Sequence, residues 1–503
     1  MNAPSPKVPP ASRRPRSLGC FLACILTGCA VGPNFVRPNP DLPAKWSPHA
    51  LAGAGVRAGK LRAAHEPPVE WWRSFKDPTL TSLIERSAVA NLDVREGVLR
   101  IEEARAERAV ASAGFWPSLG ANAEFTRQRL SINTPNGAIF GLGSAIPELP
   151  RGIFVNPFDQ YQLGLTASWE LDLFGRVRRQ VEAADATTLA AIEDERDVLI
   201  SLESDVGETY LDLRGAQLKR SIVVESLRTQ RDVLALTRQR WRAGQTTDLD
   251  VENASSEVST TAAQLPLLDR EITQDINELS ELMDREPGAL RAELITARAV
   301  PPVPPLVPIG LPSDLARRRP DIRRAEANLH AATARLGVAV AGLFPELTLT
   351  AAGGYQSEGL AKLIGAASRF ASIGPTLELP VFDAGAHATV RLSDVQAKEA
   401  GIDYARTVLG ALHDVENVLA AYGADQDRRV ALTAAAGSSR IALELARDRY
   451  ETGITSFLEV LDAERTLEQN QLSLADATTA VSTDLVALYK ALGGGWQAGS
   501  ADR

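Results

Sequence analysis

The sequence predicts a mainly α-helical fold that also carries four short amphipathic β-strands. Three observations support this prediction: the two halves of the chain match each other, long Ala-rich stretches contain few helix breakers, and four segments alternate apolar and polar residues. Aromatic residues are only 5% of the 503 residues, which suits long helices packed closely on small side chains. The net charge of −9 argues against a general nucleic-acid binder.

The chain begins with a signal-peptide pattern, in which arginines precede an apolar stretch, Leu18–Leu26, that is too short to span a bilayer. It ends in Leu26-Thr27-Gly28-Cys29, which resembles a bacterial lipobox. The resemblance implies that residues 1–28 are removed and that Cys29 carries S-diacylglycerol and N-acyl groups. Because Ala30 is not Asp, it also implies sorting to the outer membrane. A plain secretory signal with a chance cysteine is the alternative.

The two halves of the chain match in order at an offset of roughly 210 residues. The matching pairs are Phe115–Leu119 with Leu343–Leu347, Trp169–Phe174 with Leu377–Phe382, and Arg240–Gly244 with Arg449–Gly453. Chance similarity between Ala-rich helices would not keep turns and strand ends in the same order. The predicted organisation is an N-terminal segment at 29–90, a first repeat at 91–283, a Pro-rich linker at 284–312, a second repeat at 313–492 and a tail at 493–503.

Each repeat contains two segments with the alternation of a β-strand that has two different faces. They lie at about 117–128, 161–173, 345–356 and 371–382. Each has close to the 9–11 residues of a tilted membrane strand, and no apolar run reaches the roughly 18 residues of a membrane helix. The carboxylates fall on the polar face: Glu124, Glu170, Asp172, Glu346 and Glu378. A half-buried strand of a soluble sheet is the alternative for each segment alone.

One chain cannot supply a complete membrane structure from four strands. About eight strands are the practical minimum for a barrel, and an open sheet edge is not viable in lipid. Two copies would give eight strands with an interior filled by side chains, whereas three copies would give twelve strands and leave room for a pore. The connections at Ser131–Pro157 and Ser357–Ser368 would then face the outside of the cell.

Long helices are predicted between the strands and two sharp turns. They cover about 91–114, 176–240, 248–283, 321–342, 386–450 and 457–492. The longest hold some 65 residues and would reach on the order of 100 Å at 1.5 Å per residue. Gly244 and Gly453 mark the turns, and apolar residues at helical spacing predict a coiled-coil-like contact. A soluble helical rod is the alternative, but it would need neither the strands nor the signal peptide.

Four motifs of the mature chain are distinctive: Cys29–Pro38, Trp71–Leu80, Arg318–Glu326 and Arg449–Ala463. Together they resemble the outer membrane factor family, the TolC/OprM-like efflux channels, and within it the NodT-type lipoproteins of multidrug (RND-type) systems. The resemblance extends over essentially all of the mature chain.

The resemblance implies a homotrimeric, TolC-like duct. A twelve-stranded membrane β-barrel in the outer membrane, with four strands from each chain, would continue into a periplasmic barrel of long antiparallel helices with an equatorial domain. The family is passive and has no catalysis or cofactor. It conducts drugs and small toxic compounds from an RND-type inner-membrane transporter and a periplasmic adaptor protein to the outside.

The same resemblance assigns the adaptor contact and the periplasmic gate to two hairpin tips, Arg240–Thr247 and Arg449–Ser456. The residues assigned to the gate and tips are Gly244, Asp248, Tyr450, Gly453, Glu459 and Asp462. Three copies of each of the last two carboxylates around one axis would favour cations. Thr455 stands where TolC has a basic gate residue, so the ionic lock of the family lacks its basic member here. The alternative is that Glu459 and Asp462 are solvated charges on a helix surface.

Other functions are compatible with the same architecture or with the same leader. A type I protein-secretion duct and a heavy-metal efflux duct would share the fold. A structural or enzymatic periplasmic lipoprotein is an alternative of a different class. The five His residues are scattered without metal-ligand spacing, and no phosphate-binding loop or nucleophile–base motif occurs. We therefore predict that the protein is not an enzyme and has no metal site.

Overall fold

The computed structural model describes residues 30–40, 42–47, 61–62, 68–135, 138, 140 and 155–496. The predicted signal peptide, the predicted acylation site Cys29, most of the connection expected at Ser131–Pro157 and the end of the C-terminal tail lie outside these residues. The chain divides into two compact units. Unit 1 is Met1–Val36, Ala104–Thr187 and Leu329–Glu399, and unit 2 is Arg37–Glu103, Thr188–Asn328 and Ala400–Arg503.

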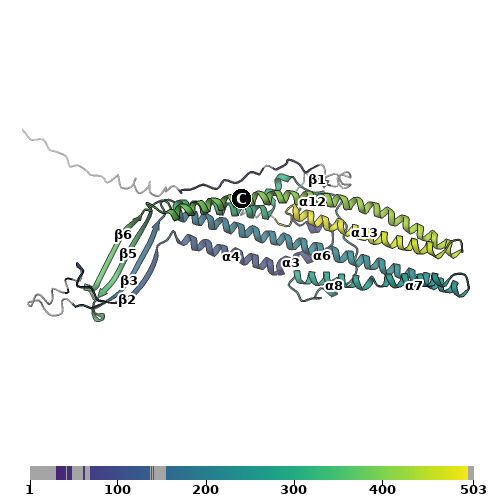
Figure 1. Ribbon diagram of the computed structural model, residues 1–503, viewed down its shortest axis with the longest axis horizontal. Coiled ribbons are helices and arrows are strands. Elements are labelled where there is room, and N and C mark those ends of the chain that lie inside the picture. The colour runs from purple at the N-terminus through teal and green to yellow at the C-terminus, as the bar shows by residue number, and fades with distance from the viewer. Residues whose placement is uncertain are drawn as a thin grey trace, which may run out of the picture. The chain divides into compact units, whose positions relative to one another are not determined.

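The chain is mainly helical, as the sequence predicts. The longer helices are α3 (Pro78–Ala90), α4 (Leu92–Ala113), α6 (Arg176–Arg242), α7 (Asp248–Ala262), α8 (Leu265–Leu282), α11 (Pro320–Ala341), α12 (Ala384–Glu451) and α13 (Phe457–Ala491) (Figure 1). Short turns are η1 (Trp71–Phe75), α9 (Arg291–Leu294), η2 (Pro312–Asp314), α10 (Leu315–Arg318), η3 (Leu360–Lys362) and η4 (Ala366–Ser368). None of the helices in the described ranges is long and apolar enough to pass through a membrane.

Prolines shorten two of the predicted elements. The prediction of a single helix at 248–283 is wrong, because α7 and α8 are separated at residues 263–264. Pro266 lies in the first turn of α8. It has no N–H to donate a hydrogen bond to the carbonyl four residues earlier, and its ring disfavours helical backbone at the preceding residue. A helix that continued from α7 would therefore be interrupted here. The fourth strand ends at Glu378 rather than at 382, two residues before Pro380.

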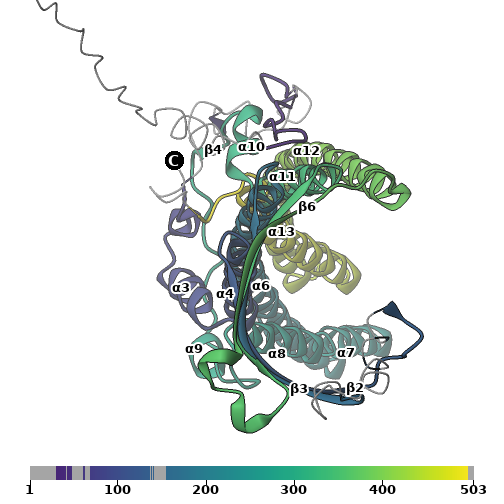
Figure 2. The same ribbon diagram turned by 90° about the vertical axis from the view of Figure 1, so that its left-hand side faces the viewer.

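Unit 1 contains a four-stranded antiparallel sheet in the order β2, β3, β5, β6. The strands are β2 (Ser118–Gln128), β3 (Phe158–Leu171), β5 (Glu346–Ser357) and β6 (Arg369–Glu378). Figure 2 shows that the sheet is strongly curved from one edge to the other. The edge strands β2 and β6 each pair with only one strand among the described residues. Each strand overlaps the segment predicted for it.

The first described residues belong to unit 1 and pack against the start of α6. The amide of Val31 donates a hydrogen bond to the carbonyl of Phe174, at 3.0 Å. Gly175 has a φ of +85°, and a Cβ atom there would lie 2.7 Å from the Cα of Ala30. Only glycine permits both this backbone conformation and this approach. The chain directly after residue 29 is therefore held at the start of α6.

Unit 2 has its most buried core where η1 meets two long helices. Trp71 is fully buried, and its ring stacks on Tyr489 of α13 with 5.7 Å between centroids. A Cβ atom on Gly207 of α6 would lie 2.9 Å from the Trp71 ring, so glycine makes this packing possible. A short parallel pair also lies in this unit, between β1 (Leu61–Arg62) and β4 (Val307–Pro308).

Candidate functional site

The pairing of the strands gives the sheet two chemically different faces. One row across the four strands is Leu119, Ala167, Ala351 and Ile373, and the adjacent row is Ser118, Ser168, Thr350 and Gly374. Neighbouring rows point to opposite sides, so apolar residues share one face and polar residues share the other. Large side chains of the apolar face are exposed in the single chain, with Leu119 at 72% and Ile373 at 76%. Such a face requires an apolar environment or a partner.

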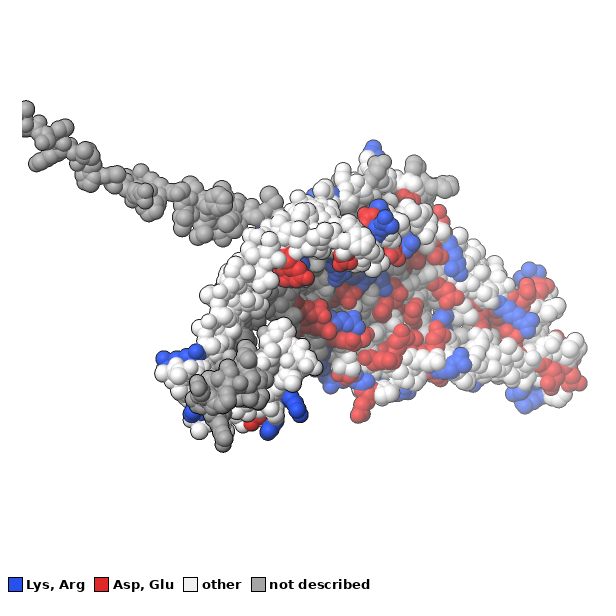
Figure 3. All heavy atoms as spheres, turned by 60° about the vertical axis from the view of Figure 1, so that its left-hand side comes forward, with Lys and Arg blue, Asp and Glu red and all other residues white. Residues whose placement is uncertain are grey.

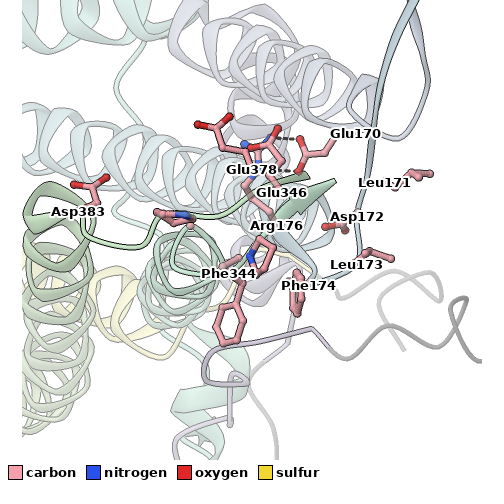
Figure 4. A pocket seen from close by; sticks show the side chains of 14 residues that line it. Glu170, Leu171, Asp172, Leu173, Phe174, Arg176, Phe344, Glu346, Glu378 and Asp383 are labelled. Carbon is pink, nitrogen blue, oxygen red and sulfur yellow. Dashed lines mark hydrogen bonds and ion pairs between the residues drawn. The ribbon is translucent and has the colours of Figure 1, made fainter. Parts of the chain in front are cut away.

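The polar face ends in a pocket of about 240 Å³ that is rich in carboxylates. Figure 4 shows Glu170, Glu346 and Glu378 directed toward one region, with Arg176 from the start of α6 between them. The Nε of Arg176 donates to the Oε1 of Glu170 at 2.9 Å, and its Nη2 donates to the other oxygen. Hydrogen bonding to Glu170 raises the pKa of Arg176, and Glu346 also favours its charged form. Three carboxylates against one guanidinium leave this end of the polar face negative.

The other two predicted carboxylates have different surroundings. Glu124 lies within the sheet, where its register partner is Gln162 on the polar face. Asp172 follows β3 and accepts hydrogen bonds from the amides of Val177 and Arg178, at 3.2 and 3.0 Å. Asp172 therefore satisfies free amides in the first turn of α6, and the helix dipole favours its negative charge.

The first helical hairpin turns between α6 and α7. Gly244 has a φ of +73°, which L-residues rarely adopt. Thr247 and Asp250 form a reciprocal capping box at the start of α7. Burial acts to raise the pKa of Asp250, but hydrogen bonds from Thr246 and Thr247 outweigh it and the pKa is lowered. Asp248 is exposed in the first turn of α7.

The second hairpin turns between α12 and α13. Gly453 has a φ of +77°, so both hairpins use a left-handed glycine at the turn. Glu459 and Asp462 are exposed near the start of α13. Tyr450 is only 5% exposed and packs against Phe457, with 6.0 Å between ring centroids.

Arg240 of α6 connects the two hairpins. Its guanidinium lies 4.5 Å from the centroid of the Tyr450 ring and donates a hydrogen bond to the carbonyl of Tyr450. A Cβ atom on Gly453 would be 3.6 Å from the Nη2 of Arg240. The hydroxyl of Tyr450 is buried and has no hydrogen-bond partner among the described residues. The ring and the carbonyl of Tyr450, rather than its hydroxyl, therefore make this contact.

Ion pairs to two buried glutamates and an apolar cluster hold the helices together behind the tips. Arg447 binds Glu464 at 2.7 Å across α12 and α13, and Arg465 binds Glu257 of α7 at 2.6 Å. Burial raises the pKa of Glu464, and the hydrogen bond from Arg447 opposes this shift. The cluster beside them consists of Val233, Leu234, Ala254, Leu443, Tyr450, Phe457, Val460 and Leu461.

The structure brings some of the predicted tip residues together and separates others. Tyr450 contacts Arg240 and Gly453 lies close to the same guanidinium, whereas Glu459 and Asp462 lie on the exposed side of α13. The sequence analysis places Arg240 at the start of the first hairpin tip but assigns it no contact with Tyr450. Within the described ranges, no group of three or more His, Cys, Asp or Glu side chains is arranged to hold a metal ion.

Comparison with known proteins places these features in one context. The family model described as "Outer membrane efflux protein" matches residues 83–284 and 311–494. The toluene efflux pump outer membrane protein TtgF of Pseudomonas putida is 32% identical, over 95% of this chain and 96% of the relative. The outer membrane protein OprJ of Pseudomonas aeruginosa is 33% identical, over 95% of each chain. The solved outer-membrane channel OprN is 34% identical with a TM-score of 0.83, covering 93% of this chain and all of OprN.

Proposed function

The chain belongs to the outer membrane efflux protein family, and we propose that three copies of it form the passive outlet of a tripartite efflux pump. Relatives that match almost the whole chain are named outer membrane proteins of efflux pumps, and the fold is that of the TolC-like outer-membrane channels. The protein is thus an outer-membrane component of an efflux pump. The trimer, the particular partners and the lipid anchor are the parts that we propose.

The two-faced sheet with unpaired edges carries the proposal. Its apolar face suits lipid, its polar face suits a water-filled lumen, and β2 and β6 each leave one edge free in the described chain. Joining β6 of one copy to β2 of the next, three times, gives twelve strands without a free edge. The helices also offer a surface to a neighbour, because Val395, Ile402 and Leu409 of α12 are exposed at seven-residue spacing.

We further propose that the partners are a periplasmic adaptor and an RND-type inner-membrane transporter, which select and energise the cargo. A relative named for toluene efflux supports small organic compounds as the cargo class. The chain itself is proposed to catalyse no reaction and to need no cofactor. We propose that the two hairpin tips contact the adaptor and form the gate. The residues assigned to these roles are Gly244, Asp248, Tyr450, Gly453, Glu459 and Asp462.

The lipid anchor at Cys29 is supported by the position of the residues that follow it. Val31 is bonded to the carbonyl of Phe174, where β3 has ended and α6 is about to begin. Exposed aromatic side chains, Trp116 and Phe382, lie at the equivalent ends of two other strands. Aromatic residues are typical of a membrane interface, so acyl chains on Cys29 would start beside the lipid.

Native mass spectrometry of the purified full-length protein, combined with planar-bilayer recording, tests this proposal. We expect a trimer in which each chain starts at Cys29 and carries its acyl groups, and we expect stepwise ionic currents. A monomer that passes no current would contradict the duct, and an unacylated chain that still forms a conducting trimer would contradict only the anchor.

Charge reversal at Glu459 and Asp462 is expected to move the selectivity of the open channel from cations toward anions. Three copies of two carboxylates around one axis attract cations, and lysines in their place repel them. The reversal potential in a salt gradient measures this change, with E459Q/D462N expected to fall between the wild type and E459K/D462K. An unchanged reversal potential in both variants would show that these are solvated surface charges.

A further inference from the structure

One end of the sheet in unit 1 is basic, in contrast to the acidic end beside α6. The cations are Arg127 and Arg129 at the end of β2, Lys362 in the connection between β5 and β6, and Arg369 at the start of β6. Among the described residues, Asp159 and Glu358 are the acidic side chains of the same region. Figure 3 shows a surface that is mostly white over the sheet, with blue side chains at the far ends of the strands.

Two of these arginines belong to the apolar face. Arg369 is the register partner of Tyr355, which in turn is paired with Leu163. Arg127 is two residues beyond Phe125, whose ring lies 4.8 Å from that of Tyr161. Because residues two apart on a strand share a face, both guanidiniums extend from the side that carries the apolar and aromatic residues.

The described part of the chain neutralises these cations only partly. Arg127 approaches Asp159 at 3.6 Å but keeps 65% of its side chain exposed. Arg129, Lys362 and Arg369 make no ion pair with any residue that the structure describes. A cation on a lipid-facing side is unfavourable in hydrocarbon, and it becomes favourable when it reaches an anionic headgroup at the interface.

Arg127 and Arg369 lie on opposite edges of the sheet, so pairing of neighbouring copies would bring Arg369 of one copy close to Arg127 of the next. Arg127 is on β2 and Arg369 is on β6, which are the two edges of the sheet. When β6 of one copy pairs with β2 of the next, the strands lie about 4.8 Å apart and the same ends meet. Each junction then presents guanidiniums from two copies, and guanidinium binds phosphate with two parallel hydrogen bonds.

From this arrangement, which rests on the proposed trimeric duct, we infer a lipid-binding function for the basic end of the sheet. Arg127 and Arg369, assisted by Arg129 and Lys362, bind the phosphate groups of the phosphorylated glycolipid that forms the outer leaflet of the outer membrane. The aromatic pair Phe125 and Tyr161 lies directly beside this end. Such rings are typical of the depth at which acyl chains meet headgroups.

Lipid titration of the full-length acylated trimer in detergent, followed by native mass spectrometry, tests the inference. The probes are lipid A with both phosphates and the same lipid after enzymatic dephosphorylation. We expect the wild type to bind the phosphorylated lipid at least tenfold more tightly than the dephosphorylated one. R127Q/R369Q should lose this preference, whereas R391Q, which removes an exposed arginine of α12 outside the sheet, should keep it.

The possible outcomes separate this inference from the proposed duct. Equal binding of both lipids by the wild-type trimer overturns the inference whatever the variants do, and so does an unchanged preference in R127Q/R369Q. If the double variant fails to assemble, the single variants R127Q and R369Q replace it, each with an expected partial loss of preference. Absence of the trimer or of ionic current in the wild type contradicts the duct instead.

Discussion

Gly354→Val is expected to abolish the folded outer-membrane form of this protein, whereas Gly374→Val is expected to leave it at the wild-type level. Gly354 of β5 is paired with Gly164 of β3, and a Cβ atom on Gly354 would collide with the carbonyl oxygen of Leu163 and the Cα of Gly164. These are backbone atoms of the adjacent strand, so no rotamer change can relieve the collision. The cost exceeds the ~1–3 kcal/mol typical of an overpacked core, because strand pairing itself is lost.

Gly374 is a matched control on the same sheet. It lies in β6, and a Cβ atom there would meet nothing within 4 Å. Valine also favours extended backbone, so Gly374→Val adds the same side chain without a collision. Heat-modifiable trimers in semi-native gels of outer-membrane fractions measure the folded protein, with total protein measured by immunoblot. Equal trimer levels for the two variants would mean that β3 and β5 are not paired at this register in the assembled protein.

The strands were accessible to sequence reasoning because their signal is local. The alternation around Leu163 and Leu347 survives in the structure, because the antiparallel register aligns apolar rows with apolar rows across all four strands. The left-handed glycines at both hairpin turns follow from sequence for a similar reason, since Gly244 and Gly453 interrupt otherwise continuous helical patterns.

Contacts between distant segments were not accessible in the same way. Arg240 and Tyr450 are 210 residues apart. Nothing in the local sequence around either residue specifies that the Arg240 guanidinium will lie over the Tyr450 ring. The break between α7 and α8 had a local signal in Pro266, which the helical periodicity on both sides obscured. The single chain shows that Glu459 and Asp462 are exposed. The distance between each carboxylate and its equivalents in other copies depends on how the copies pack.

Arg240→Ala is expected to raise the open probability of the channel strongly. The Arg240 guanidinium joins α6 to the second hairpin, because it lies over the Tyr450 ring and donates a hydrogen bond to the Tyr450 carbonyl. A desolvated cation–π contact contributes about 2 kcal/mol, and the hydrogen bond contributes about 1 kcal/mol more. Loss of only about 1–2 kcal/mol of this total changes an equilibrium by a factor of roughly 5–30, which single-channel recording and uptake of a large antibiotic would both detect.

Tyrosine variants distinguish this contact from a general weakening of the tip. The Tyr450 hydroxyl has no partner in the described chain, so Tyr450→Phe keeps the ring and should behave as wild type. Tyr450→Ala removes the ring that Arg240 covers, and in combination with Arg240→Ala it should add little to either single change. Full additivity of the two alanine variants would show that the residues act separately. A leaky Tyr450→Phe channel would instead assign the contact to the hydroxyl, because the phenyl ring alone preserves the surface on which the guanidinium lies.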